Sequence, residues 1–99
     1  MFQTGSRRSS VQIIGDTLNF LRLGAAERTE IMNSVNISHN QTDKYIAVLL
    51  ELGFLSTPME ESRPSCYRVT EKGLNLLREI ENVQALLSKC ATGGNLNYP

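Results

Sequence analysis

The first apolar residues of the chain recur at helical spacing. Ser9, with Gln12 three residues later, forms a capping-box pattern at the start of this stretch, and Gly24 stands at its end. The apolar residues between them lie three or four positions apart: Val11, Ile14, Leu18 and Leu21. This spacing predicts an amphipathic helix. Gly15 inside it costs about 1 kcal/mol relative to alanine, so we expect a close helix contact there.

Two further helices are predicted on either side of a very short break. The first runs over residues 27–34, and its apolar positions are Ile31, Met32 and Val35. The break is only about three residues long by this pattern. Ser38 then caps the next helix, with Gln41 completing a second capping-box pattern. Two helices joined by so short a turn must cross steeply, which is the geometry of a helix-turn-helix.

The helix that begins at Ser38 has two unlike faces and two unlike halves. Helical spacing places one set of residues toward a core: Thr42, Tyr45, Ile46, Leu49 and Leu50. The opposite set is Asn40, Lys44, Ala47 and Glu51. The apolar residues gather in the C-terminal half, so we expect the polar N-terminal half to protrude. We expect Tyr45 to lie in the core with its hydroxyl at the rim. Gly53 suits the left-handed position that ends a helix, with Phe54 folding back onto Leu49.

A short β-hairpin and a long helix complete the pattern. Residues 54–57 and 66–69 are β-prone and enclose a polar loop with a proline near each end, which favours a short hairpin. Thr70 caps the last helix, which we expect to run about 20 residues to Lys89. Leu74 and Leu77 are expected to reach the core. A second set has the spacing of a coiled-coil seam: Leu76, Ile80, Val83, Leu87 and Cys90. Either a second copy covers this seam or the helix lies across its own domain.

Composition places the chain among ordinary globular proteins. It has 99 residues, 40% of them hydrophobic and 20% charged, and no apolar run approaches the roughly 20 residues that span a bilayer. The first ten residues lack the apolar stretch of a secretory signal, so we expect a cytoplasmic protein and no membrane partner. In a reducing compartment Cys66 and Cys90 are expected to behave as small apolar residues. Lys plus Arg and Asp plus Glu both total 10, so any nucleic-acid contact must depend on where the charges lie.

The sequence offers no arrangement for catalysis. It has no phosphate-binding glycine loop, no histidine beside a nucleophile and no acid pair in a pocket-forming segment, so we do not expect an enzyme. His39 is the only histidine and has no cysteine or carboxylate partners at ligand spacing, so a phosphate contact or simple exposure is expected rather than a metal site. We expect no cofactor. Nothing in the sequence addresses a small-molecule effector.

Three segments carry a resemblance to a known superfamily: RTEIMNSVNISHNQTDKYI, GFLSTP and YRVTEKGLNLL. They resemble the turn and recognition helix, the first wing strand, and the last strand with the following helix start of winged helix-turn-helix domains. More narrowly, the chain is similar to the small archaeal winged-helix proteins of roughly ten kilodaltons that bind DNA and dimerise through a C-terminal helix. The resemblance implies a mainly α (α+β) fold with three helices, a β-hairpin wing and a C-terminal dimerisation helix. The chain differs from that family in having no net charge, whereas members of the family tend to be lysine-rich.

The resemblance implies which residues meet double-stranded DNA. It places residues 38–44 in the major groove, and the side chains of that segment with suitable chemistry are Ser38, His39, Asn40, Gln41, Asp43 and Lys44. Asn40 and Lys44 are the candidate base readers. Gln41 is expected to take part in the helix cap, and Asp43 is expected to be solvated or to pair with Lys44. The wing tip would lie at the backbone or minor groove, although Glu60 and Glu61 there would repel phosphates. The candidate phosphate contacts are Arg28, Arg63, Arg68, Arg7 and Arg8, the last two from a flexible N-terminal arm or else an ordinary solvated end.

The resulting prediction is a homodimeric transcriptional regulator. Its parts are a flexible basic arm over residues 1–8, a winged helix-turn-helix domain over 9–69, a dimerisation helix over 70–90 and a flexible tail over 91–99. The alternative is a winged-helix module that binds a protein partner within a transcription complex without touching DNA, and the zero net charge is its best support. The target sequence, the regulated genes and the sign of regulation are not encoded in these patterns.

Overall fold

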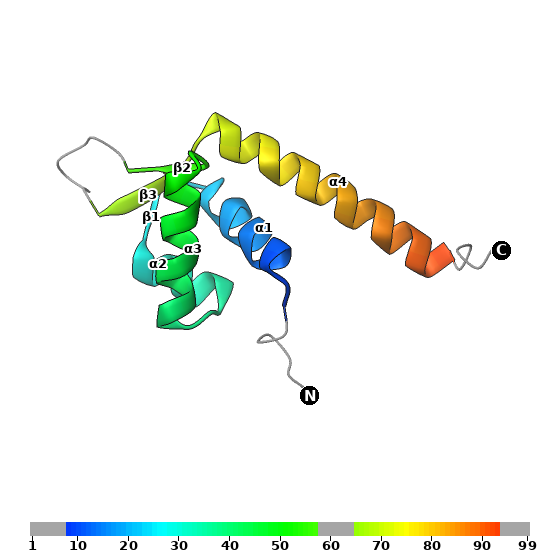
Figure 1. Ribbon diagram of the computed structural model, residues 1–99, viewed down its shortest axis with the longest axis horizontal. Helices are drawn as coiled ribbons and strands as arrows, with labels where there is room; N and C mark the ends of the chain where they lie inside the picture. The colour runs from blue at the N-terminus through cyan, green and yellow to red at the C-terminus, as the bar shows by residue number, and fades with distance from the viewer. Residues whose placement is uncertain (1–7, 58–64, 94–99) are drawn as a thin grey trace.

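The computed structural model describes residues 8–57 and 65–93, and for residues 89–93 it describes the backbone alone. The elements follow in the order α1 (Ser10–Leu21), β1 (Ala26–Glu27), α2 (Arg28–Val35), α3 (His39–Glu51), β2 (Leu55–Ser56), β3 (Cys66–Val69) and α4 (Glu71–Gly93). Figure 1 shows α2 and α3 together at one end of the molecule, with α4 running from the sheet alongside α1 and on past it. The predicted helices and wing strands are therefore confirmed, and together they form a winged-helix fold.

The sheet has one strand more than the sequence predicted. β3 lies in the middle, pairing antiparallel with β2 on one side and with β1 on the other. The β1 pairing aligns Ala26 with Tyr67 and Glu27 with Cys66. A strand of two residues carries no alternating pattern, so no periodicity along the chain could indicate it. Its effect is to fix the start of α2 directly beside the wing.

The core lies between the helices and the sheet. Its buried members come from every helix and from β1 and β2: Ile13, Leu18, Leu21, Ala26, Ile31, Val35, Ile46, Leu49, Leu55 and Leu77. Cys66 is also fully buried as a free thiol, which confirms its expected role as a small apolar residue. The prediction for α1 was wrong at its first turn, because Ile13 is buried there while Val11 is 50% exposed. Leu74 on α4 is also more exposed than predicted, at 37%.

The helix ends follow the local sequence signals. Ser9 and Ser38 both form the predicted capping boxes, with Gln12 and Gln41 as the reciprocal partners. At the end of α3 the Phe54 N–H donates to Leu49 O at 2.9 Å and the Gly53 N–H donates to Leu50 O at 3.1 Å. Gly53 has a φ of +84°, so this is the predicted Schellman closure. Local chemistry therefore sets where α1 and α3 begin and where α3 ends.

The predicted seam on α4 is divided between two environments. Ile80 is only 8% exposed and lies against Gly15 of α1, where an added Cβ would come within 3.3 Å of Ile80 Cγ2. Leu76 is half-buried against the same core. The predicted close contact at Gly15 is confirmed, and Ile80, which the sequence assigned to the dimer seam, is largely buried within its own domain. Val83 and Leu87 remain 52% and 65% exposed, and the Cys90 side chain lies outside the described residues.

Candidate nucleic-acid interface

The first turns of α3 carry the polar surface that the sequence predicted. Thr42, Ile46 and Leu49 are buried on one side, whereas Asn40 and Lys44 are exposed on the other. Thr42 Oγ1 also donates to Ser38 O at 2.8 Å, which satisfies the one polar group that faces the core there. The predicted division of this helix into a buried and an outward face is therefore confirmed.

Capping occupies two of the predicted site residues. The Gln41 N–H donates to Ser38 Oγ at 3.1 Å, and Gln41 Oε1 accepts from the Ser38 N–H at 3.3 Å. Gln41 is half-buried as a result. Both side chains serve to begin the helix, so Ser38 Oγ and Gln41 Oε1 already have hydrogen-bond partners within the cap.

A charged cluster joins the start of α2 to the first turns of α3. Arg28 Nε donates to Asp43 Oδ1 at 2.5 Å, and Arg28 Nη2 donates to His39 O at 3.1 Å and lies 3.2 Å from His39 Nδ1. The hydrogen bond from Arg28 holds the pKa of the Asp43 carboxyl below its ordinary value, and the same bond raises the pKa of Arg28. Asp43 thus pairs with Arg28 rather than with Lys44 or solvent alone.

Asn40 and Lys44 lie on the same exposed face without such a partner. Within the described part of the chain, no carboxylate pairs with Lys44; its Nζ lies 5.9 Å from the centroid of the Tyr45 ring. Asn40 has no hydrogen-bond partner among those residues. Tyr45 is half-buried with its hydroxyl 2.9 Å from Ser10 Oγ, which confirms its predicted place at the rim of the core. The arrangement leaves one amide and one ammonium available for contacts with another molecule.

The wing contributes one described cation. Arg68 is exposed on β3, where it is aligned with Ser56 of β2. On the far side of β3, Tyr67 lies close enough to Arg28 to affect its pKa, so the wing and the α3 cluster are neighbours through β1. The predicted contacts at Arg63, Glu60 and Glu61, and that at Arg7, fall on residues outside those that the structure describes.

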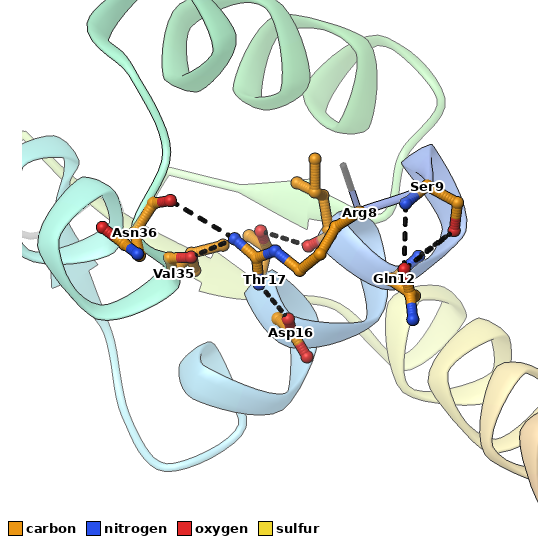
Figure 2. Close-up of polar contacts among 8 residues, drawn as sticks. Arg8, Ser9, Gln12, Asp16, Thr17, Val35 and Asn36 are labelled. Carbon is orange, nitrogen blue, oxygen red and sulfur yellow. Dashed lines mark hydrogen bonds and ion pairs between the residues drawn. The ribbon is translucent and has the colours of Figure 1, made fainter. Parts of the chain in front are cut away.

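Arg8 is not the free arm residue that the sequence indicated. Figure 2 shows its side chain directed into the molecule, toward Asp16 of α1 and the backbone at the end of α2. Arg8 Nη1 lies 2.5 Å from Asp16 Oδ2, and Nη2 donates to Val35 O and, at 3.4 Å, to Asn36 O. The prediction was wrong because the partners are main-chain oxygens 27 and 28 residues away, which no local pattern reveals.

Other kinds of site find no support in the described residues. Over residues 8–57 and 65–88, whose side chains the structure describes, there is no group of three or more His, Cys, Asp or Glu side chains arranged to hold a metal ion. Among the helices described in residues 8–57 and 65–93, none has both the length and the hydropathy needed to cross a bilayer.

The order of elements and the exposed α3 face agree with a match to a family model, which decides the family. A winged helix-turn-helix family model matches residues 7–88. The chain belongs to the winged helix-turn-helix family. No curated protein matches it. Among solved structures it is similar to Sso10a-2, a DNA-binding protein from Sulfolobus solfataricus, with a TM-score of 0.71 at 24% identity, covering 93% of this chain and 99% of that one.

Two bacterial regulators have a similar fold at lower identity. The PcaV transcriptional regulator from Streptomyces coelicolor, in complex with its natural ligand, gives a TM-score of 0.70 at 17% identity, covering 88% of this chain and 62% of that one. The adhesin competence repressor AdcR from Streptococcus pyogenes gives 0.61 at 16% identity, covering 95% and 70%. These similarities show that the fold around α3 is shared. The residues of this chain that could contact a partner must be identified from the geometry of α3 itself.

Proposed function

We propose that this winged helix-turn-helix protein is a homodimeric regulator that binds double-stranded DNA, with α3 in the major groove. The observation that carries the proposal is the exposed pair Asn40 and Lys44, which has no carboxylate partner within the described part of the chain. A major groove about 12 Å wide admits a helix, and amide and ammonium groups pair with adenine and guanine edges there. Sso10a-2 is itself a DNA-binding protein, which supports the same role here.

The remaining polar groups of the α3 tip position the helix in this proposal. Arg28 pairs with Asp43 and donates to the main-chain oxygen of His39. The Arg28–Asp43 ion pair therefore contributes little net charge but orders the first turns of α3. Its outward N–H groups and Arg68 on the wing supply phosphate contacts. Since the chain as a whole is neutral, binding should depend on these few positions. Selective binding at particular sites is therefore favoured over uniform coating of DNA.

The dimer in this proposal uses the outer half of α4. Val83 and Leu87 are exposed on α4, and together with Val11 of α1 they line a groove of about 600 Å³. Two such surfaces brought together would remove these apolar side chains from water. Two-fold symmetry would then place two α3 helices on half-sites about 34 Å apart or a multiple of that distance.

The alternative function is a protein-interaction module with the same fold. The zero net charge favours it, because most DNA-binding surfaces carry a basic excess. The two functions differ in their response to salt. DNA binding through several cations weakens log-linearly as salt rises, whereas a mainly apolar protein contact does not.

The test of the DNA-binding proposal is a fluorescence anisotropy titration against random duplex at two salt concentrations. Lys44→Glu should weaken binding about tenfold or more, because a cation facing the groove becomes an anion. Asn40→Ala should weaken binding to a preferred sequence more than to random duplex. The matched control is Arg78→Glu, which makes the same charge change at an exposed position on α4. Equal losses in Lys44→Glu and Arg78→Glu would show that α3 is not the reader.

The test of the dimer is light scattering on the full chain with Leu87→Glu. A glutamate at this position would be buried between paired α4 helices, so the variant should be monomeric. Leu23→Glu is the control, because Leu23 is 78% exposed and lies outside the α4 seam. A wild-type protein that is monomeric at high concentration would remove the dimer from the proposal and leave the α3 test unaffected.

A further inference from the structure

The segment before α1 contacts the helix-turn-helix in a way that the proposed function does not use. Arg8 reaches across from the start of α1 and donates through Nη2 to Val35 O and Asn36 O, which end α2 (Figure 2). Through Nη1 the same guanidinium pairs with Asp16 of α1 at 2.5 Å. One side chain therefore bridges α1 and the turn that leads into α3.

The conformation of the turn between α2 and α3 affects how α3 is oriented. Only Asn36, Ile37 and Ser38 separate α2 from α3, and Asn36 adopts a left-handed conformation with a φ of +64°. The direction in which α3 leaves the turn depends on this conformation. The last carbonyls of a helix have no partner within it and carry partial negative charge, so a guanidinium bound to them stabilises that end. Arg8 thus stabilises the conformation that orients α3.

Asp16 keeps the guanidinium in this position. The Arg8 side chain is 23% exposed whereas that of Asp16 is 53% exposed, so the arginine is the more enclosed partner. Charged hydrogen bonds are stronger than neutral ones and fix the plane of the guanidinium. With Asp16 in place, the positive charge of Arg8 is directed inward and is compensated there.

A second contact ties α1 to the other side of the reading segment. Ser10 Oγ lies 2.9 Å from the Tyr45 hydroxyl, and Tyr45 follows Lys44 on α3. The start of α1 therefore holds the chain both before α3, at Asn36, and within it, at Tyr45. The exposed residues Asn40 and Lys44 lie between these two points.

We infer that Arg8 is a positioning residue, which fixes the turn before α3 and thereby the placement of Asn40 and Lys44 on DNA, without contacting DNA itself. The inference rests on the proposed function for its effect on DNA, and on the contacts of Arg8 alone for its effect on the turn. It makes an unusual prediction about Asp16. Removing this negative charge should weaken DNA binding, although electrostatics alone would strengthen it.

The experiment uses the full chain and compares Asp16→Asn with Glu81→Gln, which removes the same charge from an exposed position on α4. Anisotropy with duplex DNA should show Asp16→Asn binding roughly three- to tenfold more weakly than wild type, because a smaller fraction of molecules has α3 correctly placed. Glu81→Gln should bind as well as wild type or slightly better. Arg8→Ala should weaken binding without lowering the salt dependence, since no phosphate contact is lost.

Amide hydrogen exchange supplies a readout that is independent of DNA. The N–H groups of Asn36 and Ile37 both donate to Met32 O, at 2.9 and 3.3 Å. In Asp16→Asn their protection should fall about fivefold, the factor expected for one lost hydrogen bond. The Leu52 amide, which donates to Val48 O at 3.0 Å, should exchange as in wild type.

The outcomes separate this inference from the proposed function. Tighter DNA binding by Asp16→Asn, together with a salt dependence lowered by about one ion in Arg8→Ala, would mean that Arg8 touches phosphate, and the inference would be wrong. If wild type binds no duplex, the proposed function fails, and exchange at Asn36 and Ile37 decides the role of Arg8 in the turn. Unchanged protection at both amides would overturn that role as well.

Discussion

Gly73 lies where the start of α4 meets the end of α3, and it leaves no room for a side chain. A Cβ at this position would overlap the Phe54 carbonyl oxygen and come within 2.8 Å of Val69 Cγ2. The same carbonyl oxygen accepts the Thr70 N–H at 3.0 Å. Backbone cannot move aside as a flexible side chain can. Gly73→Ala must therefore displace α4 from the wing and strain the hydrogen bond that links Thr70 to Phe54.

The size of the effect follows from two opposing contributions. Overpacking a tight contact costs about 1–3 kcal/mol, whereas replacing glycine by alanine in a helix gains at most about 1 kcal/mol. We therefore expect the free energy of unfolding to fall by roughly 1–2 kcal/mol, on the basis of that balance. For a domain of this size such a loss lowers the Tm by about 5–15 °C.

Gly15→Ala is the matched control for this prediction. Its Cβ would meet only Ile80 Cγ2, the end of a side chain, at 3.3 Å. The gain in helix propensity then offsets mild crowding, and the change in unfolding free energy should stay within about 1 kcal/mol. Urea denaturation followed by circular dichroism measures both variants. If Gly73→Ala is as stable as wild type or more stable, the close packing of α4 on the Phe54 carbonyl is refuted.

Two further changes test the ends of the helices and the charged cluster. Thr70 Oγ1 accepts the Gly73 N–H at 3.0 Å and donates to Gly53 O at 2.7 Å, so Thr70→Ala should lose about 1–2 kcal/mol in urea denaturation while Thr70→Ser retains most of it. Equal stability of the two variants would contradict this role. Because Arg28 lowers the pKa of Asp43, the stabilisation from their pair is complete above the ordinary value of 3.8 and is lost as pH falls below it. NMR titration should show the Asp43 midpoint shifting upward in Arg28→Ala, and an unchanged midpoint would argue against the pair.

The α3 surface was largely predictable because its determinants are close together in sequence. Capping depends on residues three apart, and the division into buried and exposed faces depends on a repeat of 3.6 residues. Both kinds of signal identified Ser38 as the helix start and Asn40 and Lys44 as outward. The partners of Arg28 and Asp43 were missed, since they lie 15 residues apart and meet only when α2 and α3 cross.

The division of α4 shows the same limit. Its apolar spacing is uniform from Leu76 to Leu87, so nothing in the pattern separates the part that packs internally from the part that does not. The boundary is set by α1, which packs closely on Ile80 at Gly15, whereas Val83 and Leu87 line an open groove beside the first turn of α1 and stay exposed. Val11 of α1 lines the groove that contains Val83 and Leu87, although its helical spacing predicted a place in the core.

By itself, the sequence determined the helices, their caps, the short turn before α3 and the outward polar face that follows it, because each depends on neighbours within about one or two turns. The tertiary structure alone decided that Arg8 binds the end of α2, that a two-residue strand joins the wing, and that Ile80 of the predicted α4 seam is already buried within its own domain. These contacts join backbone groups and surfaces that are far apart in the chain. Every residue has a main-chain carbonyl, so the residue type does not indicate which carbonyl will accept a hydrogen bond from a distant side chain.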